Sequence, residues 1–159
     1  MIPPFIEYHI TDIHRIELIR TLWIQLNEHH RSHAGAFQDH YRQWTFDDRR
    51  EYFLKIAAAG SLRSDLARDP RSGRYIGYCV TSFSKDREGE IESVFVEEAY
   101  RSQGVGATLV GKALAWLTEN GAIRNRVSVA DGNEEAFPFY RKFGFFPRMT
   151  VLEQKKDCP

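Results

Sequence analysis

The chain has 159 residues, the usual length of one domain, and its 42% hydrophobic and 13% aromatic residues exclude a disordered chain. The 22 basic residues equal the 22 acidic ones. No net charge therefore draws the protein to nucleic acid or to an anionic membrane surface, and we expect neither as a partner.

Cysteine usage and the N-terminal residues indicate a compartment. Cys79 and Cys158 are too few for a disulfide framework. The start, M-I-P-P-F-I-E-Y-H-I, has prolines and a glutamate where a signal peptide has a basic segment and an apolar run. No stretch approaches the ~20 apolar residues of a membrane span. We expect a cytoplasmic protein.

The first 60 residues predict one short strand followed by helices. Residues 5–10 form a strand pattern, and Thr11 or Asp12 can cap the helix that follows it. That helix is indicated, up to about Arg31, by apolar residues at helical spacing: Ile16, Ile19, Trp23 and Leu26. Residues 30–44 are mixed and predict a loop with some helix.

A second helix is predicted after this loop. Thr45 or Asp47 can cap it, and Gly60 ends it. From Gly60 onward the pattern changes to strands and turns. The strands are S-L-R-S-D-L-A, R-Y-I-G-Y-C-V-T-S-F-S and I-E-S-V-F-V-E-E, separated by the turns D-P-R-S-G and K-D-R-E-G-E. We expect an antiparallel meander.

The C-terminal half alternates helices and strands. A helix of about 15 residues is predicted from Val105 to the Asn120-Gly121 stop. The strand R-V-S-V-A follows, then a helix over residues 133–143 that Pro138 delays or bends, then the strand F-F-P-R-M-T-V-L-E. With no repeat and no linker, we expect residues 1–159 to form a single domain with an α/β fold, a mixed sheet and helices on both faces.

A glycine turn, Y-R-S-Q-G-V-G-A-T-L, lies between the meander and the first of these helices. Gly104 and Gly106 leave backbone amides unhindered at a helix start, where a phosphate binds well. The dinucleotide fingerprint fails at Leu109, and the P-loop pattern fails at Ala113, which has no hydroxyl for magnesium. An unliganded tight turn is the alternative.

Two motifs carry a family resemblance. The first, R-x-x-G-x-G, is formed by Arg101, Gly104 and Gly106, and the second, N-x-x-A-x-x-F-Y followed by G-F, comprises Asn133, Ala136, Phe139, Tyr140, Gly144 and Phe145. Together they resemble the GNAT superfamily of acetyl-CoA-dependent N-acetyltransferases. The resemblance implies a GNAT-type, largely antiparallel sheet, an acetyl-CoA-binding core over residues 75–150, and acceptor-shaping helices in residues 1–60, where only the helix order matches.

The resemblance also implies which residues bind acetyl-CoA. Backbone amides of the turn would hold the pyrophosphate through Arg101, Ser102, Gln103, Gly104, Val105, Gly106 and Ala107. The pantetheine arm would run along the backbone of Phe95 and Val96, as an added strand does. Core packing is the alternative for these two side chains. Asn133, with Ala136 of the same motif, would bond the pantetheine amide or cap the helix.

Acetyl transfer needs a base for the amine and an acid for the departing thiolate. Glu92 is the candidate base, because some family members place a catalytic glutamate in this strand. An exposed strand glutamate is the alternative, because the alternation of side chains along a strand does not tell which face of the sheet Glu92 occupies. Tyr140 is the candidate acid, because the matching tyrosine is the usual general acid of the family and a phenol stays protonated at neutral pH. A core tyrosine is the alternative.

Histidines near the end of the first helix invite a metal interpretation: His29, His30, His33 and His40. No third ligand at a recognisable spacing accompanies the i, i+4 pair, so we expect no metal. The same segment would border the acceptor site in the family, with Glu28, Asp39, Tyr41 and Trp44. Glu28 could hold a cationic substrate, and a solvated carboxylate is its alternative.

The sequence thus predicts an N-acetyltransferase that moves an acetyl group from acetyl-CoA to an amine of a small molecule or peptide by direct attack. An acyltransferase using another acyl-CoA, and a CoA-binding regulatory module without turnover, are the alternatives. Antibiotic, polyamine, amino acid and protein amines all stay open as acceptors. The resemblance also makes a homodimer an expectation.

Overall fold

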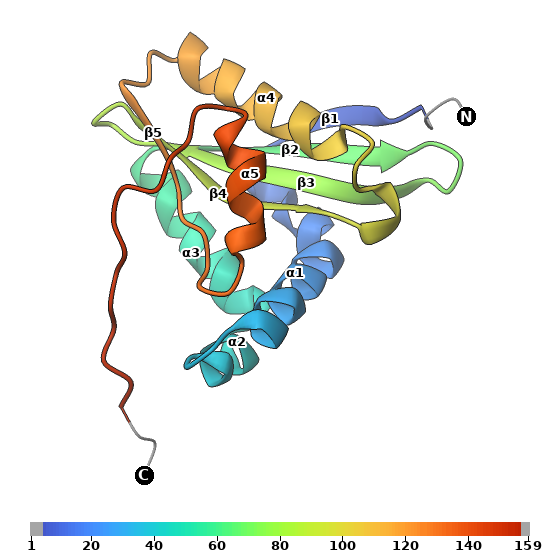
Figure 1. Cartoon of the computed structure of the whole chain (residues 1–159). Helices are drawn as coiled ribbons and strands as arrows, with labels where there is room; N and C mark the ends of the chain where they lie inside the picture. The colour runs from blue at the N-terminus through green and yellow to red at the C-terminus, as the bar shows by residue number, and fades with distance from the viewer. Residues whose placement is uncertain (1–4, 157–159) are drawn as a thin grey trace.

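A computed structural model describes residues 5–156 and contains one five-stranded sheet with helices over both faces (Figure 1). The strands lie in the order of the chain: β1 (Glu7–Thr11), β2 (Ser61–Asp69), β3 (Arg74–Phe83), β4 (Glu88–Val96) and β5 (Arg124–Val127). The first four pair antiparallel, and β5 pairs parallel to β4. The predicted mixed, largely antiparallel α/β architecture is confirmed.

One face of the sheet is covered by the helices of the first 60 residues: η1 (Ile13–Ile19), α1 (Arg20–His33), α2 (Gln38–Gln43) and α3 (Phe46–Ala59). Asp12 caps the first turn by accepting a hydrogen bond from the His14 amide. The predicted first helix is divided, because Arg15 has a non-helical backbone and the chain up to Ile19 is a 3-10 helix. Thr45 caps α3, as predicted, through a reciprocal pair of bonds with Asp48.

The other face carries the helices of the C-terminal half. The chain passes from β4 through η2 (Glu98–Tyr100) into α4 (Val105–Glu119), which packs on β2, β3 and β4. The 15 residues of α4 and its end at Asn120 agree with the predicted helix. The last helical segments are η3 (Glu134–Ala136) and α5 (Phe137–Arg141), so the predicted helix is bent where Pro138 enters it. No helix among residues 5–156 is long and apolar enough to cross a membrane.

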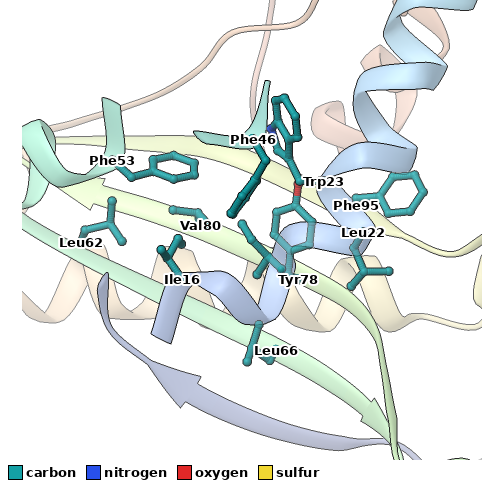
Figure 2. Close-up of a cluster of buried hydrophobic side chains, with 11 residues drawn as sticks. Ile16, Leu22, Trp23, Phe46, Phe53, Leu62, Leu66, Tyr78, Val80 and Phe95 are labelled. Atoms are coloured by element: carbon teal, nitrogen blue, oxygen red, sulfur yellow. The ribbon is translucent and has the colours of Figure 1, made fainter. Parts of the chain in front are cut away.

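Two apolar cores lie on opposite faces of the sheet. The first, between the sheet and helices α1 and α3, contains the aromatic side chains of Trp23, Phe46 and Tyr78 (Figure 2). The second lies under α4 and α5, where Leu109 and Val110 are fully buried. Burial of each large apolar side chain contributes about 1.5–3 kcal/mol to folding. The sheet is therefore fixed from both sides.

Two predicted strands differ in the structure. The strand expected at R-V-S-V-A already ends at Val127, because β4 and β5 part there. The strand expected over residues 145–153 is absent; this segment is extended and lies away from the sheet (Figure 1). The segment has β-propensity, but no strand among the described residues pairs with it. Pro147 also lacks the backbone N–H that would donate a hydrogen bond to a neighbouring strand. Four of its large apolar side chains are exposed: Phe146, Met149, Val151 and Leu152.

One β-bulge interrupts the pairing of β3 with β4. Val80 is opposite Ser93 and Thr81 is opposite Ile91, so Glu92 is an extra residue in β4. A bulge places two consecutive residues on the same face and re-aims a side chain. Ser93 accordingly bonds the hydroxyl of Tyr78 in the first core, on the face where Glu92 also lies, whereas Ile91 belongs to the second core.

Candidate active site

A cavity of about 310 Å³ opens where β4 and β5 separate. The two strands pair only as far as Ile91 and Val127. Beyond this point β4 contributes residues 91–94 to the cavity wall, and the chain after β5 contributes residues 127–130. Because the gap lies within the sheet, side chains from both faces reach the same space. The cavity brings together three predicted site residues: Glu92, Asn133 and Tyr140.

Glu92 enters the cavity wall from the face that α3 covers. Its carboxylate accepts a 2.6 Å hydrogen bond from the Ser82 hydroxyl and lies 3.4 Å from the Tyr52 hydroxyl. The Glu92 carbonyl accepts a bond from Arg49, whose guanidinium lies over the ring of Phe53. The Arg49 side chain therefore bonds the backbone of the bulge. The Glu92 carboxylate is contacted from β3, through Ser82, and from α3, through Tyr52.

The surroundings of Glu92 change its affinity for a proton in both directions, with a net rise of its pKa. Burial raises the pKa of Glu92 above its ordinary value, and the negative charge of Glu90 adds to the rise. The bond from Ser82 and the charge of Arg49 offset part of it. A carboxylate with a raised pKa binds a proton more strongly than an exposed one, so it is a better proton acceptor at neutral pH.

Tyr140 reaches the cavity from the opposite face. It lies in α5, is only 7% exposed, and its ring packs edge-on against Phe139 and Phe145. Burial raises the pKa of its phenol above the ordinary value, because the phenolate would be poorly solvated. The hydroxyl is therefore held in its proton-donating form. The residue is both a core aromatic and a cavity residue, so the two alternatives for it are compatible.

Asn133 lines the cavity at the start of η3 but does not cap it. Its side chain makes no capping hydrogen bond. The carboxylate of Glu134 instead accepts a bond from the Gly132 amide. The expected capping role is thus wrong, and the amide of Asn133 stays available to the cavity. Ala136 lies one turn further on and packs against the second core.

The glycine turn lies beside the cavity, at the start of α4, and does not line it. Gly104 has a left-handed backbone with φ of +82°, which a side chain adopts only with strain, and Ser102 has φ of +59°. No side chain caps α4. The amides of Val105, Gly106 and Ala107 therefore stand at the positive end of a 15-residue helix without a capping group.

Two side chains of the turn are engaged with the protein. Arg101 donates a 2.9 Å bond to the Val96 carbonyl and lies over the ring of Phe95. Gln103 donates to the Ala99 carbonyl. Both side chains are thus used within the protein, while the first amides of α4 have no capping group. Phe95 and Val96 themselves belong to opposite cores, and beyond Ile91 this part of β4 has no strand beside it on the β5 side within residues 5–156.

The first helices form the remaining wall of the cavity. This wall is rich in aromatic and imidazole rings and comprises Trp23, Leu26, Asn27, His30, His40, Tyr41, Trp44 and Arg49. Of the residues expected to border an acceptor, Tyr41 and Trp44 lie here. Glu28 and Asp39 do not, because they are exposed and paired with Arg31 and Arg42.

Two further wall residues, Asn27 and Arg49, are not indicated by the sequence, and His30 is indicated there only as a member of the histidine cluster. Their approach to Glu92 depends on how α1 and α3 pack across the sheet, which no local pattern encodes. The density of His, Trp and Tyr over residues 29–44 was the available signal. Within residues 5–156 no three His, Cys, Asp or Glu side chains are grouped so that they could hold a metal ion.

The strand gap, the glycine turn and the aromatic motif of α5 agree with one family. The model of the Acetyltransferase (GNAT) family matches residues 17–145. The chain belongs to this family. The match begins within η1 and ends just after α5, so it includes the aromatic wall, both strands of the gap and the glycine turn.

Curated relatives of this GNAT chain bear the same family activity in their names. An uncharacterised N-acetyltransferase of Mycobacterium bovis is 34% identical over 101 residues, which is 58% of this chain and 65% of that protein. A thialysine N-epsilon-acetyltransferase of Bos taurus is 29% identical over 80 residues, 48% of this chain and 47% of that one. The chain thus spans less than two thirds of the length of these relatives.

Solved structures show that the whole chain has the GNAT fold. An aminoglycoside N-acetyltransferase, solved in complex with CoA, has a TM-score of 0.69 at 19% identity and covers 99% of this chain and 100% of its own. A protein of Bacillus halodurans has a TM-score of 0.72 at 16% identity, covering 94% of this chain and 99% of its own. At these identities the likeness concerns the fold.

Proposed function

We propose that this chain transfers an acetyl group from acetyl-CoA to a primary amine by direct attack. The observation that carries the proposal is the cavity at the strand gap, which holds a half-buried carboxylate and a buried phenol that enter from opposite faces of the sheet. Acyl transfer to an amine needs one group that accepts a proton and one that donates a proton, on either side of the reacting carbon.

Glu92 is the proton acceptor in this proposal. A primary amine with a pKa of ~10.4 is mostly an ammonium ion at neutral pH and cannot attack. Glu92 takes this proton, directly or through one water, and the free nitrogen then forms the new bond to the acetyl carbon. The raised pKa of Glu92 brings its affinity for a proton closer to neutral pH. The bond from Ser82 keeps the carboxylate oriented.

Tyr140 is the proton donor. When the carbon–sulfur bond breaks, the sulfur carries away the electron pair as a thiolate, and the Tyr140 hydroxyl supplies its proton. The nitrogen that has attacked still carries one extra proton, which it gives up to the Tyr140 phenolate, so that the tyrosine is restored. Glu92 releases the first proton to solvent, and the products are the amide, the CoA thiol and one proton. The phenol is suited to this step because its burial keeps it protonated.

The bound acetyl-CoA is held mainly by backbone. The uncapped amides at the start of α4 offer donors and a positive dipole to the pyrophosphate. The backbone of Phe95 and Val96, on the free side of β4, offers an edge along which the pantetheine amides bind, and the side chain of Asn133 adds a polar contact from the other wall. CoA is the ligand of the fold neighbour named above.

The test is thiol release from acetyl-CoA in the presence of an amine panel, with calorimetric titration of acetyl-CoA alongside. Binding with amine-dependent thiol release is the expected result. Acetyl-CoA that binds but never turns over against any amine would contradict the proposal and favour a regulatory module.

A further inference from the structure

The acceptor end of the cavity carries almost no net charge. Among its lining residues Glu92 is the one carboxylate and Arg49 the one guanidinium. The guanidinium is already bonded to the Glu92 carbonyl and lies over the rings of Tyr52 and Phe53. A ligand with several ammonium groups would find one carboxylate among these lining residues for all of them.

His30 does not change this charge. It lies in the wall between Tyr41 and the other histidines of α1, and its Nδ1 atom is buried without a hydrogen-bond partner among the described residues. Burial, with the nearby charges of His29 and Arg49, lowers the pKa of His30 to about 4. The imidazole is therefore neutral at physiological pH and acts as a flat, weakly polar surface.

Aromatic rings dominate the same wall. Trp44 meets His40 edge-on at 4.9 Å between ring centroids, Tyr41 lies 5.6 Å from His30, and Trp23 belongs to the first core. Rings arranged at these distances favour stacking and edge contacts with a further planar group. Trp44 lines the cavity. Its indole nitrogen is buried without a partner within residues 5–156, so it is a free hydrogen-bond donor in this wall.

A second hollow shares His40 and Trp44 with the cavity and could extend it toward acidic residues. It does not supply a site for a second ammonium group. Asp48 is committed to the cap of α3 through the amide and hydroxyl of Thr45. Lys55 lines the same hollow as Glu51. Its positive charge disfavours an ammonium group beside Glu51.

The size of the cavity gives a further limit. Its volume of about 310 Å³ is at the small end of the ~300–1,000 Å³ of ligand sites, and part of it is needed for the acetyl end of the cosubstrate. A single ring on a short chain fits within such a space, whereas an acceptor built of several linked rings would have to extend beyond it.

We infer that the acceptor of the proposed acetyl transfer is an arylalkylamine: a primary monoamine whose planar apolar body lies against Trp44 and Tyr41 while its nitrogen faces Glu92. This inference rests on the proposed function and specifies its substrate class. It differs from the amines named with two fold neighbours, which were solved with an acetylneamine bisubstrate analogue and with sisomicin.

The experiment compares amines on the full chain at saturating acetyl-CoA, with thiol release as the readout. The panel contains 2-phenylethylamine, n-butylamine, spermidine and neamine. We expect kcat/KM for 2-phenylethylamine to exceed that for each of the others by about tenfold or more, the value of one good aromatic contact plus its burial. Preference for spermidine or neamine would overturn the inference and leave the acetyltransferase proposal intact. Absence of turnover with every amine would overturn both.

A pair of variants tests the wall itself. Trp44→Leu is expected to raise KM for 2-phenylethylamine about tenfold more than it raises KM for n-butylamine. Trp116→Leu is the matched control, because Trp116 lies on α4 outside the cavity, near Phe83. An equal loss for both amines in Trp44→Leu would overturn the assignment of ring recognition to this wall. The amine preference of the wild-type protein decides the proposal even if a variant does not fold.

Discussion

The Ser82 hydroxyl donates a 2.6 Å hydrogen bond to the Glu92 carboxylate across two neighbouring strands. This bond favours the charged form of a group that burial drives toward neutrality. The proton affinity of the candidate base is therefore set by two opposed effects, and each can be removed by a single substitution.

Replacing the carboxylate should remove the base. Glu92→Gln is expected to lower kcat/KM by ~10²–10⁴-fold, most strongly at low pH, with partial rescue at high pH where free amine is abundant. The measurement is the pH profile of thiol release. Glu119→Gln is the matched control, because Glu119 is an exposed glutamate of α4 that does not line the cavity. A variant profile identical to that of the wild type would exclude Glu92 as the base.

Removing the Ser82 hydroxyl should shift the pH profile of kcat/KM without abolishing activity. Ser82→Ala takes away the bond that lowers the pKa of Glu92, so this pKa rises further. The base is then ionised only at higher pH, and the acid limb of kcat/KM should move to higher pH while the plateau is largely kept. A shift toward lower pH, or none, contradicts this account of the bond.

Glu92 should also cost stability at neutral pH. A carboxyl whose pKa is raised by folding stabilises the folded state below its ordinary pKa of 4.5, and this contribution is lost as pH rises through the folded-state value. The amide of Glu92→Gln does not titrate. The free energy of unfolding of the variant should therefore increase relative to wild type between about pH 4 and about pH 7. Urea unfolding at both pH values measures it, and a constant difference would speak against the effect.

The Tyr140 hydroxyl should matter for turnover and little for folding. Tyr140→Phe keeps the ring contacts with Phe139 and Phe145 and removes only the donor. We expect kcat to fall ~10²–10⁴-fold with near-normal acetyl-CoA affinity in calorimetric titration. In the control Tyr100→Phe, a hydroxyl bonded to Asp69 is lost instead. That variant should lose stability and keep kcat, and full kcat in Tyr140→Phe would assign the proton to another donor.

Substitutions at two glycines of α4 distinguish a role in acetyl-CoA binding from a general effect on the stability of the helix. A Cβ at Gly106 would lie 3.5 Å from the Phe139 ring, beside the uncapped amides, whereas a Cβ at Gly111 meets nothing within 4 Å. Gly106→Val should lower acetyl-CoA affinity by about tenfold or more by blocking approach to the amides. Gly111→Val carries the same propensity change in the same helix and should keep the affinity. Equal affinities in the two folded variants would remove the turn from the site.

Local signals in the sequence predicted much of this structure. The glycine turn, the length of α4 and the Thr45 cap follow from short-range rules and agree with the structure. The bulge at Glu92 could not be predicted, because one extra residue leaves no periodic trace and is visible only in the pairing with β3. Residues 145–153 were predicted as a strand on propensity alone. A strand also needs a neighbour to pair with, and propensity carries no information about that partner.

The two apolar cores support different parts of the candidate site. The aromatic wall rests on the core beneath α1 and α3, while the glycine turn and Tyr140 rest on the core beneath α4 and α5. Substitutions in one core need not disturb packing in the other, because the sheet stands between them. The helical wall of the cavity can therefore vary in sequence while the glycine turn and the packing of Tyr140 are kept.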